Sequence, residues 1–129
     1  MIDEFRDALE ELLEFPIHYV NVIDPSVFPL GSLAIRQMTT GPSLGSGAMS
    51  QRREISVLIT MYDTDYTMLN DYAELILDTF DGQATLLDTV EIYKCWLEDL
   101  EDESFPPIDG SNNWIYCKLL TLKFSYKKQ

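Results

Sequence analysis

Residues 54–82, EISVLITMYDTDYTMLNDYAELILDTFDG, carry the clearest structural signals in the chain. In residues 54–62, the apolar side chains at 55, 57, 59 and 61 alternate with a mixed set at 56, 58, 60 and 62. Both faces of such a strand are at least partly apolar, which predicts a position near the centre of a sheet. Asp63 or Thr64 is expected to cap the helix that follows, and Gly82 is expected to end it. The apolar stripe of this helix, spaced by three or four residues, is Leu69, Tyr72, Ala73, Ile76, Leu77 and Phe80.

Weaker signals on both sides of this segment predict the remaining elements. Residues 1–15 place apolar side chains on one stripe of a helical period, and Pro16 is expected to stop this amphipathic helix. Composition and alternation predict further strands at residues 19–23, 30–39, 89–97 and 114–126. The last strand would be about 40 Å long, which is unusual for a small domain. Its end is expected to project from the core or to pair with something outside it.

Together these elements predict one α+β domain over residues 1–129. The chain is long enough for one compact core and too short for two ordinary domains. The economical packing is a two-layer sandwich, in which two helices cover one face of an antiparallel or mixed sheet of about five strands.

A long loop separates the second and third predicted strands. Residues 39–53, TTGPSLGSGAMSQRR, are rich in glycine and serine and offer little to bury, so we predict a flexible loop. Loops of this length in small domains are usually functional or become ordered against a partner. An idle surface loop is the alternative.

The composition argues against several classes of function. Twenty-two acidic and nine basic residues give a net charge of −13, so tight binding of nucleic acid by a single copy is close to excluded. Apolar runs are far shorter than the roughly 20 residues that cross a bilayer, and the acidic residues 1–15 are unlike a signal peptide. Two cysteines without CxxC spacing argue against a disulfide scaffold and a structural zinc site, so a reducing cytoplasm is the expected compartment.

The residues of a recognisable catalytic centre are missing from the sequence. His18 is the single histidine, and we expect it to be an ordinary packed residue. Gly41, Gly45 and Gly47 lack the spacing of a phosphate-binding loop. The acidic segment 98–110, EDLEDESFPPIDG, lacks the pattern of a calcium loop and is expected to be solvated. We therefore expect neither an enzyme nor a cofactor or metal site.

Charge is distributed unevenly along the chain. Residues 1–15 hold six acids and one base, and the predicted tip of the last hairpin, residues 98–109, holds six acids and no base. Residues 114–129 hold four lysines and no acid. Subunits with opposed electrical poles can stack head to tail and close into a ring. The alternative is that this segregation is lost when the chain folds.

The acid-free segments supply the interface candidates. Arg52 and Arg53 end the long loop and could pair across a subunit boundary with acids such as Glu98 or Asp102. The full set of interface candidates is Ser43, Leu44, Met49, Arg52, Arg53, Lys123, Lys127 and Lys128.

Cys95 and Cys117 fall on the two strands of the last predicted hairpin. Pairing centred near residue 106 would make them cross-strand neighbours, whereas a register offset by two residues would oppose Glu91 to Lys123 and separate the thiols. In either register, two reduced and packed thiols are expected rather than a disulfide.

The order, size and texture of these elements resemble the tail terminator (tail completion or minor capsid) proteins of long-tailed bacteriophages. The features that match are the acidic opening helix IDEFRDALEELLEF, the Gly/Ser loop, the central strand REISVLITMYDTD followed by the helix YTMLNDYAELILDTF, and the closing hairpin. The resemblance spans nearly the whole chain and includes no diagnostic short motif.

What the resemblance implies is a virion component, made in the host cytoplasm, whose copies form a ring, typically of six. Such a ring caps the tail tube and offers a surface to the head connector, and DNA passes through it without tight binding. We expect an acidic lumen, with Glu98, Asp99, Glu101, Asp102 and Glu103 as candidates. Because acidic copies repel one another, assembly is expected to strengthen with added salt.

Two other functions stay open at this point. Head completion proteins and connector adaptors of phages are also small, acidic and ring-forming, although they are often more helical. A soluble inhibitor that mimics DNA would need acids spread regularly over one surface, whereas the acids of this chain are clustered in sequence.

Overall fold

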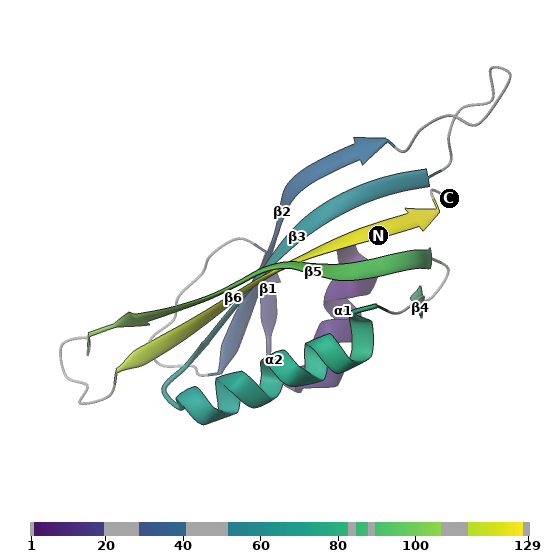
Figure 1. Cartoon of the computed structure of the whole chain (residues 1–129). Coiled ribbons are helices and arrows are strands. Elements are labelled where there is room, and N and C mark those ends of the chain that lie inside the picture. The colour runs from purple at the N-terminus through teal and green to yellow at the C-terminus, as the bar shows by residue number, and fades with distance from the viewer. Residues whose placement is uncertain are drawn as a thin grey trace, which may run out of the picture.

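The computed structural model describes residues 2–19, 29–40, 52–82, 85–87, 90–106 and 114–127. They form two layers, a twisted sheet of six strands and two helices that lie on one of its faces (Figure 1). The predicted α+β sandwich is confirmed.

The first helix, α1 (Ile2–Leu13), packs against the sheet by a narrow apolar stripe. Phe5, Leu9 and Leu13 follow one another at helical spacing, and all three are buried. The helix ends where Glu14 adopts a positive φ of 62° and donates its backbone N–H to the carbonyl of Glu10. A left-handed residue followed by Pro16 prevents the helix from continuing, as the sequence predicts.

The sheet is mixed and has the strand order β1-β2-β3-β6-β5-β4. Its strands are β1 (Ile17–Tyr19), β2 (Leu30–Thr40), β3 (Arg52–Asp63), β4 (Thr85–Leu87), β5 (Val90–Phe105) and β6 (Ile115–Lys127). β1 runs parallel to β2, and the other four pairs are antiparallel. The predicted central strand is confirmed, because β3 lies between β2 and β6.

The second helix, α2 (Tyr66–Phe80), follows β3 after a two-residue connection. Its N-cap is Asp65, whose carboxylate accepts two backbone N–H groups of the first turn at 3.0 and 3.3 Å. The prediction of Asp63 or Thr64 as the cap was wrong, because Asp63 still belongs to β3. Beyond the helix Gly82 has a φ of +74°, a left-handed conformation that glycine adopts without strain.

The main core lies between the helices and the sheet and centres on Phe5, and a smaller cluster of buried side chains, Leu30, Tyr62, Ile115 and Cys117, lies on the other face. The ring of Phe5 meets those of Phe80 and Phe124 edge to face, with centroids 5.1 and 4.6 Å apart. One side chain thereby joins both helices to a central strand. The sheet contributes the alternate, buried residues Ile55, Val57, Ile59, Met61, Leu120 and Leu122.

β5 and β6 form a long hairpin that extends past the start of α2 (Figure 1). The predicted length and projection of the last strand are confirmed, since β6 has 13 residues. β5 has 16 residues and continues to Phe105 instead of ending near residue 97. Most of the acidic segment therefore lies in a strand, and the prediction that it forms the hairpin tip was wrong. The projecting hairpin accommodates these acidic side chains because they are exposed to water, and Asp102 also pairs with Lys118.

The register of this hairpin differs from both predicted registers. Cys95 opposes Phe124 and Cys117 opposes Glu103, so the two thiols are not cross-strand neighbours. Bulges between residues 92 and 94 and between residues 97 and 99 shift the pairing, and no sequence pattern indicates them. Both cysteines are buried and free, as expected.

Several other boundaries differ from the prediction. β1 begins at Ile17, earlier than the predicted strand 19–23, and residues 20–28 lie outside the described part of the chain. β4 was not predicted, because three residues are too short to show a period. β2 and β3 extend into both ends of the predicted loop, and residues 41–51 lie outside the described residues.

Candidate assembly interface

β2 and β5, the long strands next to the short edge strands β1 and β4, each have an unpaired edge in the described part of the chain. β1 covers the outer side of β2 along residues 31–33, and β4 covers that of β5 along residues 90–92. Among the described residues no strand lies beside residues 34–40 of β2, here called the β2 edge, or residues 98–105 of β5, here called the β5 edge. An open edge presents backbone N–H and C=O groups that can pair with another chain.

The two edges lie on opposite sides of the sheet and toward opposite ends of it. Ala34 is level with Leu58, Thr121 and Asp99 on the three successive neighbouring strands. From this level the β2 edge runs alongside the first half of β3, and the β5 edge runs along the projecting hairpin. The two unpaired edges therefore lie at diagonally opposite corners of the sheet.

A bulge interrupts each outer strand close to this level. The register shifts between Ile35 and Gln37 in β2 and between Leu97 and Asp99 in β5. The inserted residues are Arg36 and Glu98. Bulges change the direction of side chains at sheet edges, and here both inserted side chains lie over the face of the sheet that is opposite the helices, which we call the open face.

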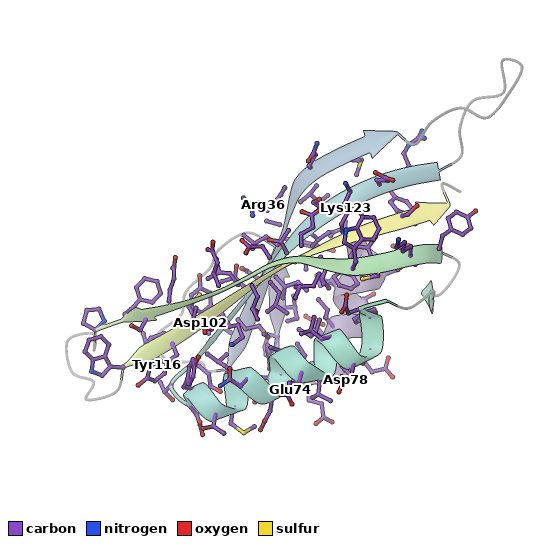
Figure 2. The ribbon with its side chains drawn as sticks, viewed as in Figure 1. Arg36, Glu74, Asp78, Asp102, Tyr116 and Lys123 are labelled. Carbon is purple, nitrogen blue, oxygen red and sulfur yellow. The ribbon has the colours of Figure 1, made fainter. Side chains whose placement is uncertain are left out.

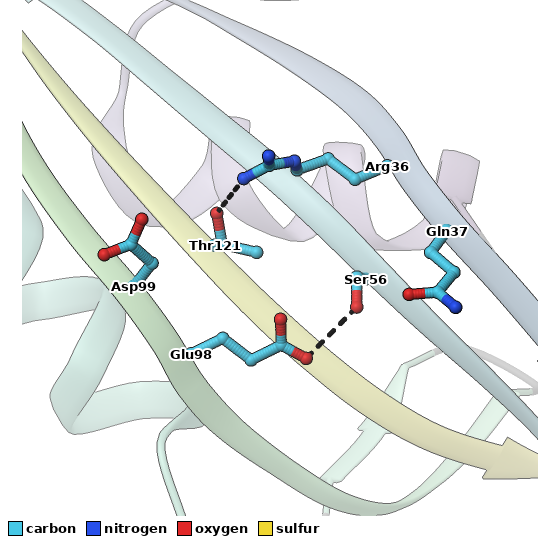
Figure 3. Close-up of a pocket in the computed structure, with 6 residues that line it drawn as sticks. All are labelled: Arg36, Gln37, Ser56, Glu98, Asp99 and Thr121. Carbon is cyan, nitrogen blue, oxygen red and sulfur yellow. Dashed lines mark hydrogen bonds between the residues drawn. The ribbon is translucent and has the colours of Figure 1, made fainter.

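A polar groove of about 410 Å³ lies on the open face between the two bulges (Figure 3). Arg36 Nη1 donates to Thr121 Oγ1 at 3.3 Å, and Ser56 Oγ donates to Glu98 Oε1 at 3.2 Å. Gln37 and Asp99 complete the lining. The groove combines a guanidinium, two carboxylates and neutral hydrogen-bonding groups, which is a composition suited to polar contact with another chain.

The predicted lumen acids do not share one face of the sheet. Asp99, Glu101 and Glu103 pair with residues of β6 whose side chains lie on the open face, and Glu98 joins them through its bond to Ser56. Asp102 pairs with Lys118, which lies on the helix-covered face. A strand alternates its side chains between faces, so a run of adjacent acids is divided between them.

Asp102, which Figure 2 labels on the long hairpin, has partners within the same chain. Its Oδ1 is 2.8 Å from Lys118 Nζ, and its Oδ2 accepts a hydrogen bond from the Tyr66 hydroxyl at 2.9 Å. The Lys118 side chain is 5% exposed, and its ammonium also lies 5.5 Å from the centroid of the Tyr66 ring. The Lys118 hydrogen bond, supported by that of Tyr66, holds the pKa of Asp102 below its ordinary value. The prediction that Asp102 lines a lumen or pairs with Arg52 of a neighbour is therefore not supported by this structure.

The basic candidates that the structure describes lie within the sheet. Lys123 Nζ is 3.7 Å from Glu54 Oε2 and 5.6 Å from the centroid of the Trp96 ring. Lys94 Nζ approaches the same ring at 5.2 Å. Arg53, predicted in the loop, is a half-buried β3 residue that opposes Thr40 on one side and Tyr126 on the other.

The remaining interface candidates are placed only in part. Arg52 opens β3 and opposes Lys127 in β6. Ser43, Leu44, Met49 and Lys128 lie outside the described residues. The structure thus brings Arg53 and Lys123 onto adjacent strands and leaves the loop candidates as predictions.

Sequence reasoning missed the groove and the exposed apolar side chains at the edges. Arg36 is a single charge in a weakly patterned strand, and only the bulge places it in the groove. Ile35 and Met38 on the β2 edge are 45% and 53% exposed, and Leu100 on the β5 edge is 44% exposed. These three residues resemble core residues in the sequence, so no local signal separates them from buried positions.

The structure also bears on features that are typical of other functions. His18 is exposed on β1, so the expectation of a packed histidine was wrong. Among the described residues, no cluster of His, Cys, Asp and Glu could hold a metal ion. In the same part of the chain, no helix is long and apolar enough to cross a membrane.

Comparison with known proteins gives a match in fold and none in sequence. No family model and no curated protein sequence matches the chain. A chain of the virion of a native gene transfer agent (GTA) particle superimposes with a TM-score of 0.57 at 9% sequence identity. The superposition covers 98% of this chain and 90% of the other. The protein therefore shares its fold, over nearly its full length, with a component of that virion particle.

Proposed function

We propose that this protein is a structural component of a virion and acts as a tail terminator, forming a ring that caps the phage tail tube and joins the tail to the head connector. The observation that carries the proposal is the full-length similarity in fold to a chain of a gene transfer agent virion. It agrees with the resemblance of the sequence to tail terminators, which rests on different evidence.

The shape of the molecule supports assembly with other copies. Two open strand edges lie on opposite sides of one sheet, so each copy offers two different surfaces to its neighbours. Contacts between unlike surfaces close into a ring when the rotation between copies permits. The projecting hairpin provides a further surface beyond the core, with Phe105 and Trp114 exposed at 38% and 48%.

In this proposal the part of the open face that holds the groove and the exposed acids of β5 lines the lumen, and the helices lie outside. Glu98, Asp99, Glu101 and Glu103 would then face the passing DNA, together with the single base Arg36 of the groove. Excess negative charge repels phosphate, so DNA would slide through without being held. Asp102 has no part in this lining, since it lies on the opposite face.

A head completion or connector adaptor protein is the second candidate. Such proteins are also small rings, but they are often more helical than a domain built on a six-stranded sheet. An acidic DNA mimic is less favoured, because the acids of β5 are divided between two faces of the sheet.

Deletion of the gene in the strain that produces the particles tests the choice between these functions. A tail terminator limits tail length, so its loss should give overlong tails without heads in electron micrographs. Loss of a head completion protein should instead give tails of normal length beside unjoined heads. Particles of normal length and normal assembly would contradict both proposals. Complementation with the intact gene is the control.

The oligomeric state of the purified protein supplies an independent test. Light scattering should show a species several times the 14.8 kDa of one chain, and electron microscopy should show closed rings. A protein that stays monomeric at every concentration and salt level tested, and that is absent from purified particles, would contradict a role in a ring.

A further inference from the structure

We propose that neighbouring copies join by pairing the β2 edge of one copy with the β5 edge of the next, so that the sheet continues across the subunit boundary. This inference rests on the proposed function and names the surfaces that form the ring. The occupant of each open edge is a second copy of this chain.

Strand direction permits this pairing. β2, β3, β6 and β5 are neighbours in that order, and each pair is antiparallel, so β2 and β5 run in opposite directions within one copy. Rotation about an axis roughly parallel to the strands preserves these directions. The β5 edge of one copy and the β2 edge of the next would therefore meet as an antiparallel pair, the usual geometry of strand addition.

The lengths and positions of the two edges also match. The β2 edge has seven residues, 34–40, and the β5 edge has eight, 98–105. They lie toward opposite ends of the sheet, so pairing them displaces the second copy along the strand direction. A closed sheet requires such a stagger, because strands must tilt relative to the axis for the barrel to close.

On the open face the charges of the two edges are complementary. Arg36 is the single ionisable residue of the β2 edge, whereas the β5 edge carries five acids, four of which lie on the open face. Arg36 lies on the same face as Glu101 and Glu103, and antiparallel pairing near the middle of both edges would bring it opposite one of them. Two β5 edges would repel each other, so the contact is directed toward the unlike edge.

On the helix-covered face each edge exposes apolar side chains, with Asp102 of the β5 edge as a charged residue paired to Lys118 of its own copy. Ile35 and Met38 oppose Val57 and Ile55, which belong to the core face of β3, and Leu100 opposes Leu120 on the core face of β6. Edge pairing would bring Ile35 and Met38 of one copy beside Leu100 of the next and bury all three. The two edges thus match in charge on one face and in apolar surface on the other.

Cysteine cross-linking tests this contact directly. In one copy, residues 37 and 101 lie on strands separated by β3 and β6, at least about 14 Å apart, which is well beyond the roughly 7 Å between Cα atoms that a disulfide spans. A disulfide in the variant Gln37→Cys/Glu101→Cys must therefore join two copies. Mild oxidation should convert most of the protein into a ladder of covalent multimers on a non-reducing gel, and reductant should remove it. The companion variant Gln37→Cys/Asp99→Cys covers one neighbouring register. Gln37→Cys/Glu103→Cys covers the other and is made together with Cys117→Ser, because the native Cys117 opposes residue 103 within the same copy.

Glu74→Cys/Glu101→Cys is the matched control, because Glu74 is exposed on α2 and away from both edges. It should give no ladder. Closed rings in the microscope without a ladder from any of the three edge variants would overturn the edge contact and leave the ring function standing. Absence of any ring or multimer would overturn both proposals.

A charge exchange provides a second test. Arg36→Glu should weaken assembly at least tenfold in sedimentation, and Arg36→Glu combined with Glu101→Arg and Glu103→Arg should restore it. Lys94→Glu is the control, since it makes the same change in net charge at an exposed residue outside both edges. Equal effects of Arg36→Glu and Lys94→Glu would contradict a specific pairing.

Discussion

Replacing Asp102 by asparagine should destabilise the protein by about 2 kcal/mol, although the change is nearly isosteric. Lys118 is 5% exposed, and its ammonium lies 2.8 Å from the Asp102 carboxylate. Hydrogen bonds that involve charged groups contribute about 1.5–3 kcal/mol, and we take the lower part of this range because the Asp102 side chain is 46% exposed. The variant keeps the shape of the side chain and leaves a buried ammonium without its counter-ion.

Lys118→Met should have a much smaller effect, of at most about 1 kcal/mol. This substitution removes the buried charge together with its desolvation cost, and methionine retains an apolar stem in the same space. The half-exposed Asp102 carboxylate is then solvated by water. The double variant should be no less stable than Lys118→Met alone, so the coupling energy between the two residues should equal the full loss of about 2 kcal/mol that Asp102→Asn causes by itself.

Urea unfolding at pH 7, followed by tryptophan fluorescence, measures these differences in the free energy of unfolding. All four proteins should be compared at one concentration, because assembly would add to the apparent stability. A loss below about 0.5 kcal/mol for Asp102→Asn, or simple additivity in the double variant, would refute the argument that Asp102 neutralises a buried lysine.

Four further outcomes are expected. Phe5→Ala should lower the free energy of unfolding by about 3–5 kcal/mol, because its fully buried ring contacts both α2 and the sheet; a loss under 1 kcal/mol in urea unfolding would be inconsistent with this packing. Burial raises the pKa of Cys95 and of Cys117 to about 12, so native protein at pH 8 should resist iodoacetamide and unfolded protein should react, as mass spectrometry can show. Because Lys118 lowers the pKa of Asp102, the ion pair contributes stability above the ordinary aspartate pKa of about 3.9 and loses it as the pH falls through the folded pKa; the stability gap between wild type and Asp102→Asn should therefore shrink below about pH 4. Added salt should shift sedimentation toward rings by screening thirteen net negative charges per copy, and a shift toward monomer would contradict this expectation.

The elements with strong local patterns could be predicted from the sequence. The stripe of α2, the alternation of β3 and the stop of α1 near Pro16 each depend on residues close together in the chain, where periodicity and backbone chemistry act directly. The length of β6 was predicted for the same reason, since its apolar face repeats every second residue. Excess acid argues, on composition alone, against tight binding of nucleic acid by a single copy.

Pairing between distant segments required the tertiary structure. The acids of β5 form one cluster in sequence, but strand alternation divides them between the two faces of the sheet. Asp102 forms an ion pair with Lys118 of the neighbouring strand β6, which local sequence does not indicate. In the described part of the chain the edges are open because β1 and β4 cover only three residues each, and the charge match that we propose between Arg36 and β5 depends on two bulges that shift the register. Local alternation indicates which side chains of a regular strand share a face, whereas bulges and the identity of each side chain's neighbours depend on strand order and register, which are set by packing across the whole sheet.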